Sequence, residues 1–308
     1  MNTLPALETP ILDAHQHFWA LDESPPYYPW LQDSEPHAFF LGDYAALRHS
    51  YLPEHYRQDS AGFDVRGTVH VEAECDRSQQ LAETEWLSAL NARTGLPSAI
   101  VAHAWFHTPD AEAVLERQAS FALVRGVRSK PVTRASPAEG PSFAPGSMQD
   151  PAWRAGFSRL RRYGLSWDLR VPAWHLEEAA TIVAREPDIP VALNHTGFPW
   201  DRSPAGLAMW RRGMRALAAH EHVYCKLSCL CLPGGPWLEA ENAPIVREAI
   251  DIFGIERCMF ASNFPVDRVR IGFADMFTAF GRMVGDLAAG ERRALFHDNA
   301  ARFYLLSV

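Results

Sequence analysis

The sequence predicts an α/β fold of the (β/α)8 TIM-barrel type, and three observations lead to it. Eight short apolar runs rich in β-branched residues alternate with longer segments of helical composition. Strands that alternate with helices pair in parallel, and eight such units close into a barrel. After the first run, where an open dinucleotide-binding sheet would carry a glycine-rich phosphate loop, the chain instead reads HFWALDESPPYYPW. We therefore prefer a barrel over an open doubly wound sheet.

Each element follows from the length and composition of its segment. The strands are expected from short runs bounded by turn residues, and the helices from longer stretches rich in Ala, Leu, Glu and Arg. The expected strands are residues 11–17, 67–73, 99–106, 123–129, 165–171, 190–197, 223–230 and 258–265. The expected helices are residues 77–95, 109–121, 150–164, 176–186, 204–220, 241–254 and 290–306. Gly95 ends the first of these helices as a C-cap glycine would.

One barrel domain is expected over residues 1–308, a common length for this fold. Two long segments interrupt the alternation. Residues 19–60 contain PPYYPWLQ and YLPEHYRQ, and residues 131–150 form a loop rich in Pro, Gly and Ser. Both follow a strand, so we expect both at the C-terminal face of the barrel as lids or binding loops.

Composition excludes several classes of protein. The formal net charge is −8 and no basic run occurs, which argues against a nucleic-acid-binding protein. No run approaches the 18 apolar residues of a membrane span, and the N-terminus lacks the features of a signal peptide. The five cysteines are expected to be buried free thiols, and a cytoplasmic location is the default expectation. The oligomeric state is left open, with a homo-oligomer as one option.

Polar residues stand near the expected C-terminal ends of the strands, where barrel enzymes carry their active sites. His15 and His17 lie one residue apart, so in a strand both side chains would face one space. Two imidazoles in an apolar strand need polar partners, and we interpret the pair as functional. The other candidates are Trp19, Glu72, Arg128, Asp168, His195, Asn263 and Asp267. Arg128 and Asp168 are equally compatible with structural ion pairs.

Four motifs, in the order DAHQHFW, LNHTGFP, MFASNFPVD and NAARFY, resemble the amidohydrolase superfamily. The resemblance is closest to the branch of sugar-lactone and aromatic-lactone hydrolases, and it implies a distorted barrel. It places His15, His17 and His195 at the superfamily's strand-one and strand-six histidines. Asn263 stands where most members have an aspartate that binds metal and shuttles the proton of the hydrolytic water. Because an amide cannot accept that proton and is a poor zinc ligand, a binuclear site is not expected.

Two mechanisms stay open at this point. In one, a single divalent metal, zinc being the first choice, would be held by residues from the set His15, His17, Glu72 and His195, and would activate water. In the other, no metal is needed. The three histidines and Arg128 would then bind the carbonyl and a carboxylate of an anionic lactone, and Asp267, Glu72 or His195 would act as base. Asn263, Asp168 and Trp19 are expected to contact the substrate in either case.

The sequence therefore predicts an enzyme that hydrolyses a small sugar- or dicarboxylate-derived lactone, with water as nucleophile. One alternative is a metal-dependent decarboxylase or hydratase of an aromatic or small carboxylic acid. A third is a barrel that has lost catalysis and only binds a small acid, against which the three histidines argue. The expected partner is a small anionic or sugar-derived molecule, without nucleic acid or membrane.

Overall fold

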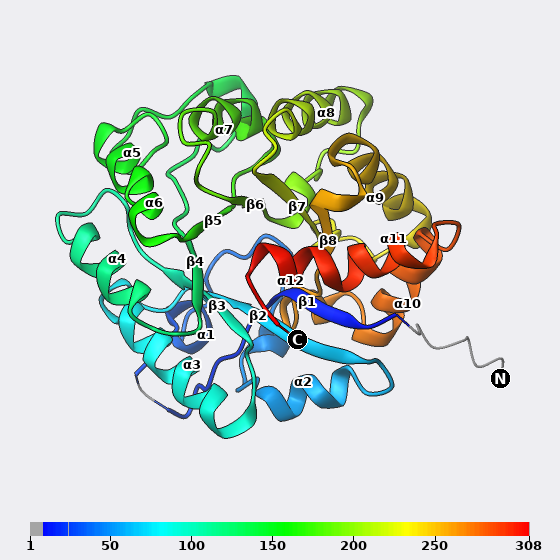
Figure 1. Ribbon diagram of the computed structural model, residues 1–308, viewed down its shortest axis with the longest axis horizontal. Helices are drawn as coiled ribbons and strands as arrows, with labels where there is room; N and C mark the ends of the chain where they lie inside the picture. Colours follow the sequence, from blue (N-terminus) through cyan, green and yellow to red (C-terminus); the bar gives the residue numbers. More distant parts are fainter. Residues whose placement is uncertain (1–8, 24, 308) are drawn as a thin grey trace.

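A computed structural model describes residues 9–23 and 25–307 and confirms the (β/α)8 barrel. Eight parallel strands run in chain order around one sheet (Figure 1). Each strand lies in, or within two residues of, a run from which it was predicted. The strands are β1 (Ile11–Gln16), β2 (Val65–Val71), β3 (Ala99–His103), β4 (Val124–Arg128), β5 (Ser166–Leu169), β6 (Val191–Leu193), β7 (Val223–Leu227) and β8 (Cys258–Phe260).

The barrel closes at the C-terminal ends of its first and last strands. His17 N donates to Phe264 O at 2.7 Å, and Asn263 N donates to His15 O at 2.7 Å. Closure thus passes through the segment directly after β8 rather than through a long ladder between β1 and β8. As a result, the histidines of β1 and the asparagine after β8 are neighbours, although about 250 positions separate them in the chain.

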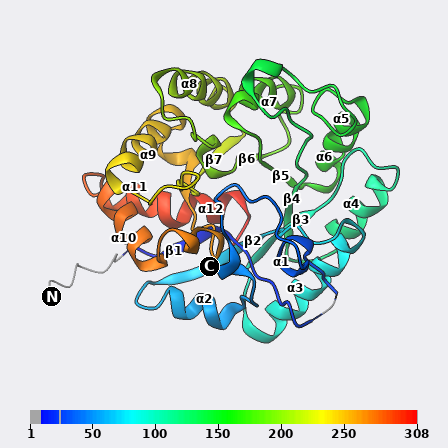
Figure 2. The same cartoon turned by 180° about the vertical axis from the view of Figure 1, so that it is seen from behind.

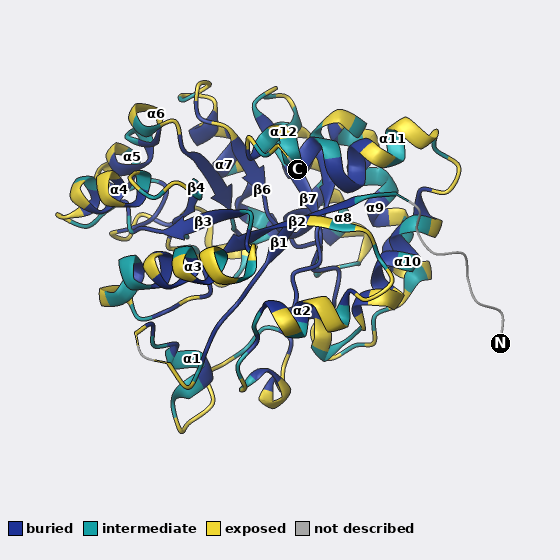
Figure 3. Cartoon of the chain, turned by 60° about the horizontal axis from the view of Figure 1, so that its bottom comes forward, coloured by how far each residue is buried: buried dark blue, intermediate teal, exposed yellow. Residues whose placement is uncertain are grey.

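Helices surround the strands, as Figure 1 shows from one side and Figure 2 from the other. Figure 3 shows the strands buried and the outer faces of the helices exposed. The helices that follow β2 to β8 are α3 (Gln80–Thr94), α4 (Ala111–Ala119), α5 (Pro151–Ser158), α6 (Leu160–Tyr163), α7 (Leu176–Val183), α8 (Pro204–Ala218), α9 (Glu239–Phe253), α10 (Phe273–Met283), α11 (Ala289–Arg293) and α12 (Asn299–Phe303). Gly95 caps α3 in the left-handed conformation, with φ of 79°, as predicted.

Helix α10 was not among the predicted helices, although its apolar residues follow a helical period. Phe273, Met276, Phe277 and Phe280 all lie on its buried face. Helix α12 covers the opposite end of the barrel from the candidate site. Asn299 Nδ2 donates to Cys258 O at 2.7 Å, at the start of β8.

The long segment after β1 contains two short helices, α1 (Pro29–Gln32) and α2 (Pro53–Asp59), rather than continuous loop. An antiparallel bridge between Trp19 and Tyr51 holds its two ends together, with N···O distances of 3.0 and 2.9 Å. The segment at 131–150 contains only one short turn of helix, at Pro137–Glu139. All five cysteines are buried free thiols, as expected. Over residues 9–23 and 25–307, no helix is both long and apolar enough to cross a membrane.

Candidate active site

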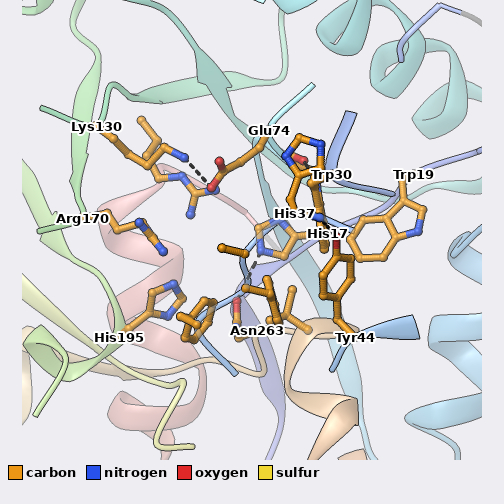
Figure 4. Close-up of a pocket in the computed structure, with 16 residues that line it drawn as sticks. His17, Trp19, Trp30, His37, Tyr44, Glu74, Lys130, Arg170, His195 and Asn263 are labelled. Atoms are coloured by element: carbon orange, nitrogen blue, oxygen red, sulfur yellow. Dashed lines mark hydrogen bonds and ion pairs between the residues drawn. The ribbon is translucent and has the colours of Figure 1, made fainter. Parts of the chain in front are cut away.

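A cavity of about 330 Å³ opens at the C-terminal ends of the strands (Figure 4). Its lining divides into an imidazole and amide group, a charged group and an aromatic wall. The first group is His17, His37, His195 and Asn263, and the second is Glu74, Arg128, Lys130 and Arg170. The aromatic wall is Trp19, Trp30, Phe39, Phe40 and Tyr44, all from the long segment after β1. The predicted position of the site and the predicted binding role of this segment therefore agree with the geometry of the cavity.

The three candidate histidines come together, but they do not play the same part. The His15 ring centroid lies 5.0 Å from that of His17 and 4.5 Å from that of His195. His17 and His195 line the cavity, whereas His15 is completely buried beneath them. An irregular register between Asp13 and Gln16, typical of a β-bulge, reorients this part of β1. The predicted pair is thus split into one residue at the cavity and one under its floor.

Burial keeps these imidazoles neutral. Desolvation, followed by the positive charge of Arg128, lowers the pKa of His17 to about 4. Desolvation and then Arg170 lower the pKa of His195 well below 6.5, and desolvation and then Lys226 do the same for His15. A neutral imidazole has one nitrogen that donates and one that accepts a hydrogen bond.

Unusual backbone conformations gather at the same ends of the strands. Six non-glycine residues with positive φ follow β2, β6, β7 and β8: Glu74, His195, Thr196, Phe198, Cys229 and Asn263, with φ between 50° and 60°. Each such conformation costs on the order of 1–3 kcal/mol, and these costs cluster at functional sites in folded proteins. The backbone therefore marks the same location as the cavity.

Glu72 and Arg128 form a buried ion pair with each other. Arg128 Nε lies 2.5 Å from Glu72 Oε1, and Arg128 Nη2 donates to the Glu72 carbonyl oxygen at 2.6 Å. Although desolvation acts in the opposite direction, Arg128 brings the pKa of Glu72 below its usual value. Glu72 does not line the cavity. The structure thus places the predicted base Glu72 away from a substrate, and it gives Arg128 to Glu72 instead of to a substrate carboxylate.

Asp168 was predicted to contact the substrate, but the structure places it in a buried network below the cavity. Lys226 Nζ lies 2.5 Å from Asp168 Oδ1, and Asn194 Nδ2 donates to the same oxygen at 2.8 Å. Tyr304, just beyond α12, donates to Asp168 Oδ2 at 3.0 Å. Both carboxylate oxygens of Asp168 therefore already accept hydrogen bonds from other parts of the barrel, and Asp168 does not face a substrate.

Asp267 lies behind Asn263 and does not reach the cavity. It belongs to a short helical turn, Val266–Val269, and is fully buried. Asn263 Nδ2 lies 2.7 Å from Asp267 Oδ1. Burial raises the pKa of Asp267 to about 7. Neither following arginine is its partner, since Arg268 lies 3.5 Å from Asp59 and Arg270 donates to Leu41 O.

The most important residue outside the predicted site is Arg170, directly after β5. Its guanidinium carbon lies 5.2 Å from the Phe198 ring centroid and 5.9 Å from that of Phe40. Within residues 9–23 and 25–307, no carboxylate lies within ion-pair distance of it. Lys130 is a second cation of the cavity that was not among the predicted site residues, and it pairs with Glu74 at the edge of the cavity (Figure 4). Arg170 is visible in the sequence as a polar strand end, but its lack of a partner is not.

The residues predicted to hold a metal do not fit one. His17 Nδ1 is 2.7 Å from Val71 O and must donate to it, because a carbonyl only accepts, so Nε2 is the only nitrogen of His17 that could bind a metal. His15 Nδ1 faces the Lys226 ammonium group at 3.5 Å, and Glu72 is held by Arg128. In the described part of the chain, no three His, Cys, Asp or Glu side chains are grouped to hold a metal ion. The surrounding cations further oppose a divalent ion.

Comparison with known proteins gives a consistent result. Residues 12–306 match the protein family described as Amidohydrolase. The Sinorhizobium fredii protein y4mH, named as uncharacterized, is 38% identical, with 96% of this chain and 98% of that protein covered. An L-fucono-1,5-lactonase of Burkholderia multivorans is 28% identical, with 96% of each chain covered. An amidohydrolase of Burkholderia multivorans, solved with bound zinc, is 26% identical with a TM-score of 0.77, covering 96% of this chain and 99% of that one.

Proposed function

The chain belongs to the amidohydrolase family, and on that basis we propose that it hydrolyses a small lactone bearing an anionic group, with water as nucleophile and without a metal. A lactone hydrolase is supported by its L-fucono-1,5-lactonase relatives, which have nearly the same length. The observation that carries the finer proposal is the guanidinium of Arg170, which forms no ion pair with any described residue, in a cavity where Lys130 and Arg128 are both paired.

The charges in and beside the cavity support an anionic substrate. Arg128 is offset by Glu72, and Lys130 by Glu74, so each of these cations has an internal partner. Arg170 forms no such ion pair with any residue that the structure describes, and it leaves one positive charge in the cavity. A guanidinium group binds a carboxylate through two parallel hydrogen bonds, and the apolar surroundings strengthen that interaction. A neutral sugar lactone has no group that would use this charge fully.

The aromatic wall suits a flat ring. Trp30 stacks on Phe39 with ring centroids 5.6 Å apart and planes 7° apart, and Phe39 also contacts Tyr44 at 4.8 Å. Such faces bind planar apolar surface well. A flat, unsaturated lactone ring that bears one carboxylate would fit both the aromatic wall and Arg170.

His195 is the general base of this proposal. Among the candidates Glu72, Asp267 and His195, it alone lines the cavity. Its Nδ1 lies 3.1 Å from Ser228 Oγ, and its Nε2 has no partner among the described residues. Neutral Nε2 takes a proton from water as the water oxygen attacks the lactone carbonyl carbon. The ring C–O bond then breaks, and the same proton passes to the leaving oxygen to give a hydroxy acid.

The negative charge that develops on the carbonyl oxygen needs a donor. Arg128 lines the cavity, and its Nη1 has no hydrogen-bond partner among the described residues, since Nε and Nη2 already donate to Glu72. A donor fixed in this way costs little reorganisation during the reaction. Glu72 thus serves the reaction by holding Arg128.

A panel of neutral sugar lactones and of muconate-type and pyrone lactones with carboxylates, read by acid release, tests the proposal. We expect the carboxylate-bearing lactones to be hydrolysed preferentially, and His195→Gln to lower kcat by at least about 100-fold. The matched control is His222→Gln, the same change at the start of β7, at the other end of the barrel. Activity on none of the carboxylate-bearing lactones, or loss of activity in both variants, would contradict the proposal.

A further inference from the structure

The contacts of His17 determine where a proton must be in the site. His17 Nδ1 donates to Val71 O, so the Nε2 atom of a neutral His17 carries only a lone pair. That Nε2 lies 3.3 Å from Asn263 Oδ1. On its other side, the Asn263 amide faces Asp267, with Nδ2 2.7 Å from Oδ1. Asn263 is therefore placed between one histidine nitrogen and one carboxyl oxygen.

The Asn263 amide can satisfy this position in two ways, related by a rotation of 180°. When Nδ2 points to Asp267, the amide oxygen faces His17 and forms a hydrogen bond only if His17 is an imidazolium. When the oxygen points to Asp267, it forms a hydrogen bond only if Asp267 carries a proton. The second arrangement gives the lone pair of neutral His17 a donor. A single proton, on His17 or on Asp267, thus decides which way the amide points.

The surroundings favour the proton on Asp267. His17 is buried near Arg128, and both effects oppose an imidazolium. Asp267 contacts Asn263 and the thiols of Cys229 and Cys231, whose hydrogen bonds lower its pKa, but burial is the larger effect and raises it; no ion pair to Asp267 forms among the described residues. Its Oδ2 atom is buried without a hydrogen-bond partner in the described part of the chain. An ionised carboxylate in this position would be expensive, whereas a neutral acid is not.

We propose that Asp267 is a positioning residue: as a neutral acid it donates to Asn263 Oδ1 and so turns Asn263 Nδ2 toward His17 and the cavity. One amide hydrogen binds His17 Nε2, and the other faces the cavity that Asn263 lines. The cavity then presents a hydrogen-bond donor near the reacting carbonyl. Ionised Asp267 would draw Nδ2 to itself and leave an acceptor oxygen facing the cavity.

For catalysis the inference rests on the proposed lactone hydrolysis, and it assigns Asp267 a role opposite to that of a base. A base is active when ionised, so activity would rise with pH. A positioning acid is active when protonated, so activity falls as pH rises through the pKa of Asp267, about 7. In the described part of the chain neither Arg170 nor Arg270 forms an ion pair with Asp267, and burial raises its pKa, so neither arginine holds Asp267 ionised.

The test compares the pH profiles of kcat/KM for the wild type, Asp267→Asn and Glu83→Gln. The amide of Asp267→Asn can donate to Asn263 Oδ1 at every pH. We expect this variant to keep activity within about threefold of wild type near pH 6, and to lose the alkaline decline. Glu83→Gln is the matched control, because Glu83 is another buried carboxyl, with its pKa raised to about 8, outside the cavity. It should keep the wild-type decline.

Two results would overturn the inference: a loss of about 100-fold or more in Asp267→Asn near pH 6, which marks a base, or an alkaline decline unchanged in that variant. A second measurement is independent of activity. The infrared carbonyl band of a protonated carboxyl should be present in the wild type near pH 6, weaken as pH rises, and be reduced in Asp267→Asn. If no lactone is hydrolysed, the proposed function fails while this band still decides the state of Asp267. If the band is the same in wild type and Asp267→Asn, the inference itself is wrong.

Discussion

Arg128 binds Glu72 through two nitrogens, Nε to the carboxylate at 2.5 Å and Nη2 to the carbonyl oxygen at 2.6 Å. The pair joins the C-terminal ends of β4 and β2, and both side chains are buried. Removing one partner of a buried ion pair leaves a charge without compensation, which costs far more than the pair gains. This pairing explains why Glu72 is not free to act as a base and why Arg128 is not free to bind a substrate carboxylate through two nitrogens.

Glu72→Gln should therefore lower the free energy of unfolding by about 3–5 kcal/mol, measured by urea denaturation. Glu72→Gln combined with Arg128→Met should recover part of this loss, because no charge then remains unpaired. The control is Glu248→Gln, which breaks the half-exposed pair with Arg211 and should cost about 1 kcal/mol or less. Equal effects at both positions would mean that the Arg128–Glu72 pair is not the buried unit described.

Arg170→Gln tests the anion site. The KM for a carboxylate-bearing lactone should rise at least about tenfold, while kcat changes less, because the lost contact binds substrate and transition state alike. Arg170→Lys keeps the charge but loses the two-point contact, so its KM should lie between those of the wild type and Arg170→Gln. A neutral lactone serves as the control substrate. Equal losses on both substrates would remove the case for an anionic one.

The stability of the protein should report the proton on Asp267. Its pKa rises from 3.8 in the unfolded chain to about 7 in the folded protein. Between these values the folded state holds a proton that the unfolded state has released, so stability falls as pH rises, by about 4 kcal/mol in total. His17, with its pKa lowered to about 4, acts in the opposite direction below pH 6.5.

The difference between wild type and Asp267→Asn isolates this effect, because the histidines are common to both. Urea denaturation from about pH 4 to about pH 8 should show the variant gaining relative stability as pH rises. A constant difference across that range would show that Asp267 has the same pKa in both states.

Asn263→Asp should change the affinity of the site for metal. It places a carboxylate beside His17 and His195, and carboxylate with imidazole is a ligand set that zinc favours. A zinc titration monitored by calorimetry should show tighter zinc binding in this variant than in the wild type. Asn263→Leu, of similar size and without a ligand atom, is the control. Equal affinity in wild type and Asn263→Asp would mean that residue 263 does not contribute to a metal site.

Much of this fold and part of the site follow from sequence alone. Alternating runs located all eight strands, because parallel strands buried on both faces are continuously apolar. The strand-end rule located His17, His195, Asn263, Arg128 and Trp19, all of which line the cavity. It could not separate them from His15, Glu72, Asp168 and Asp267, which lie under or behind the lining. Glu72 and Asp168 are bound by Arg128 and Lys226, which are distant in sequence, and only the closed barrel shows these partners. Asp267 is bound by Asn263, four positions before it, but the sequence does not show that both side chains turn toward each other.

Arg170 shows the reverse case: it matters because none of the described carboxylates forms an ion pair with it. Nothing in a local pattern distinguishes a paired from an unpaired arginine. The aromatic wall was foreseen only as an aromatic loop, since the stacking of Trp30 on Phe39 depends on how that loop folds over the barrel.

The most direct test of the account is hydrolysis of a carboxylate-bearing lactone by protein freed of metal, with the metal content measured on the same sample. The account predicts full activity in the metal-depleted wild type and a loss of at least about 100-fold in metal-depleted His195→Gln. An inactive metal-depleted wild type that regains activity with one equivalent of zinc would contradict it.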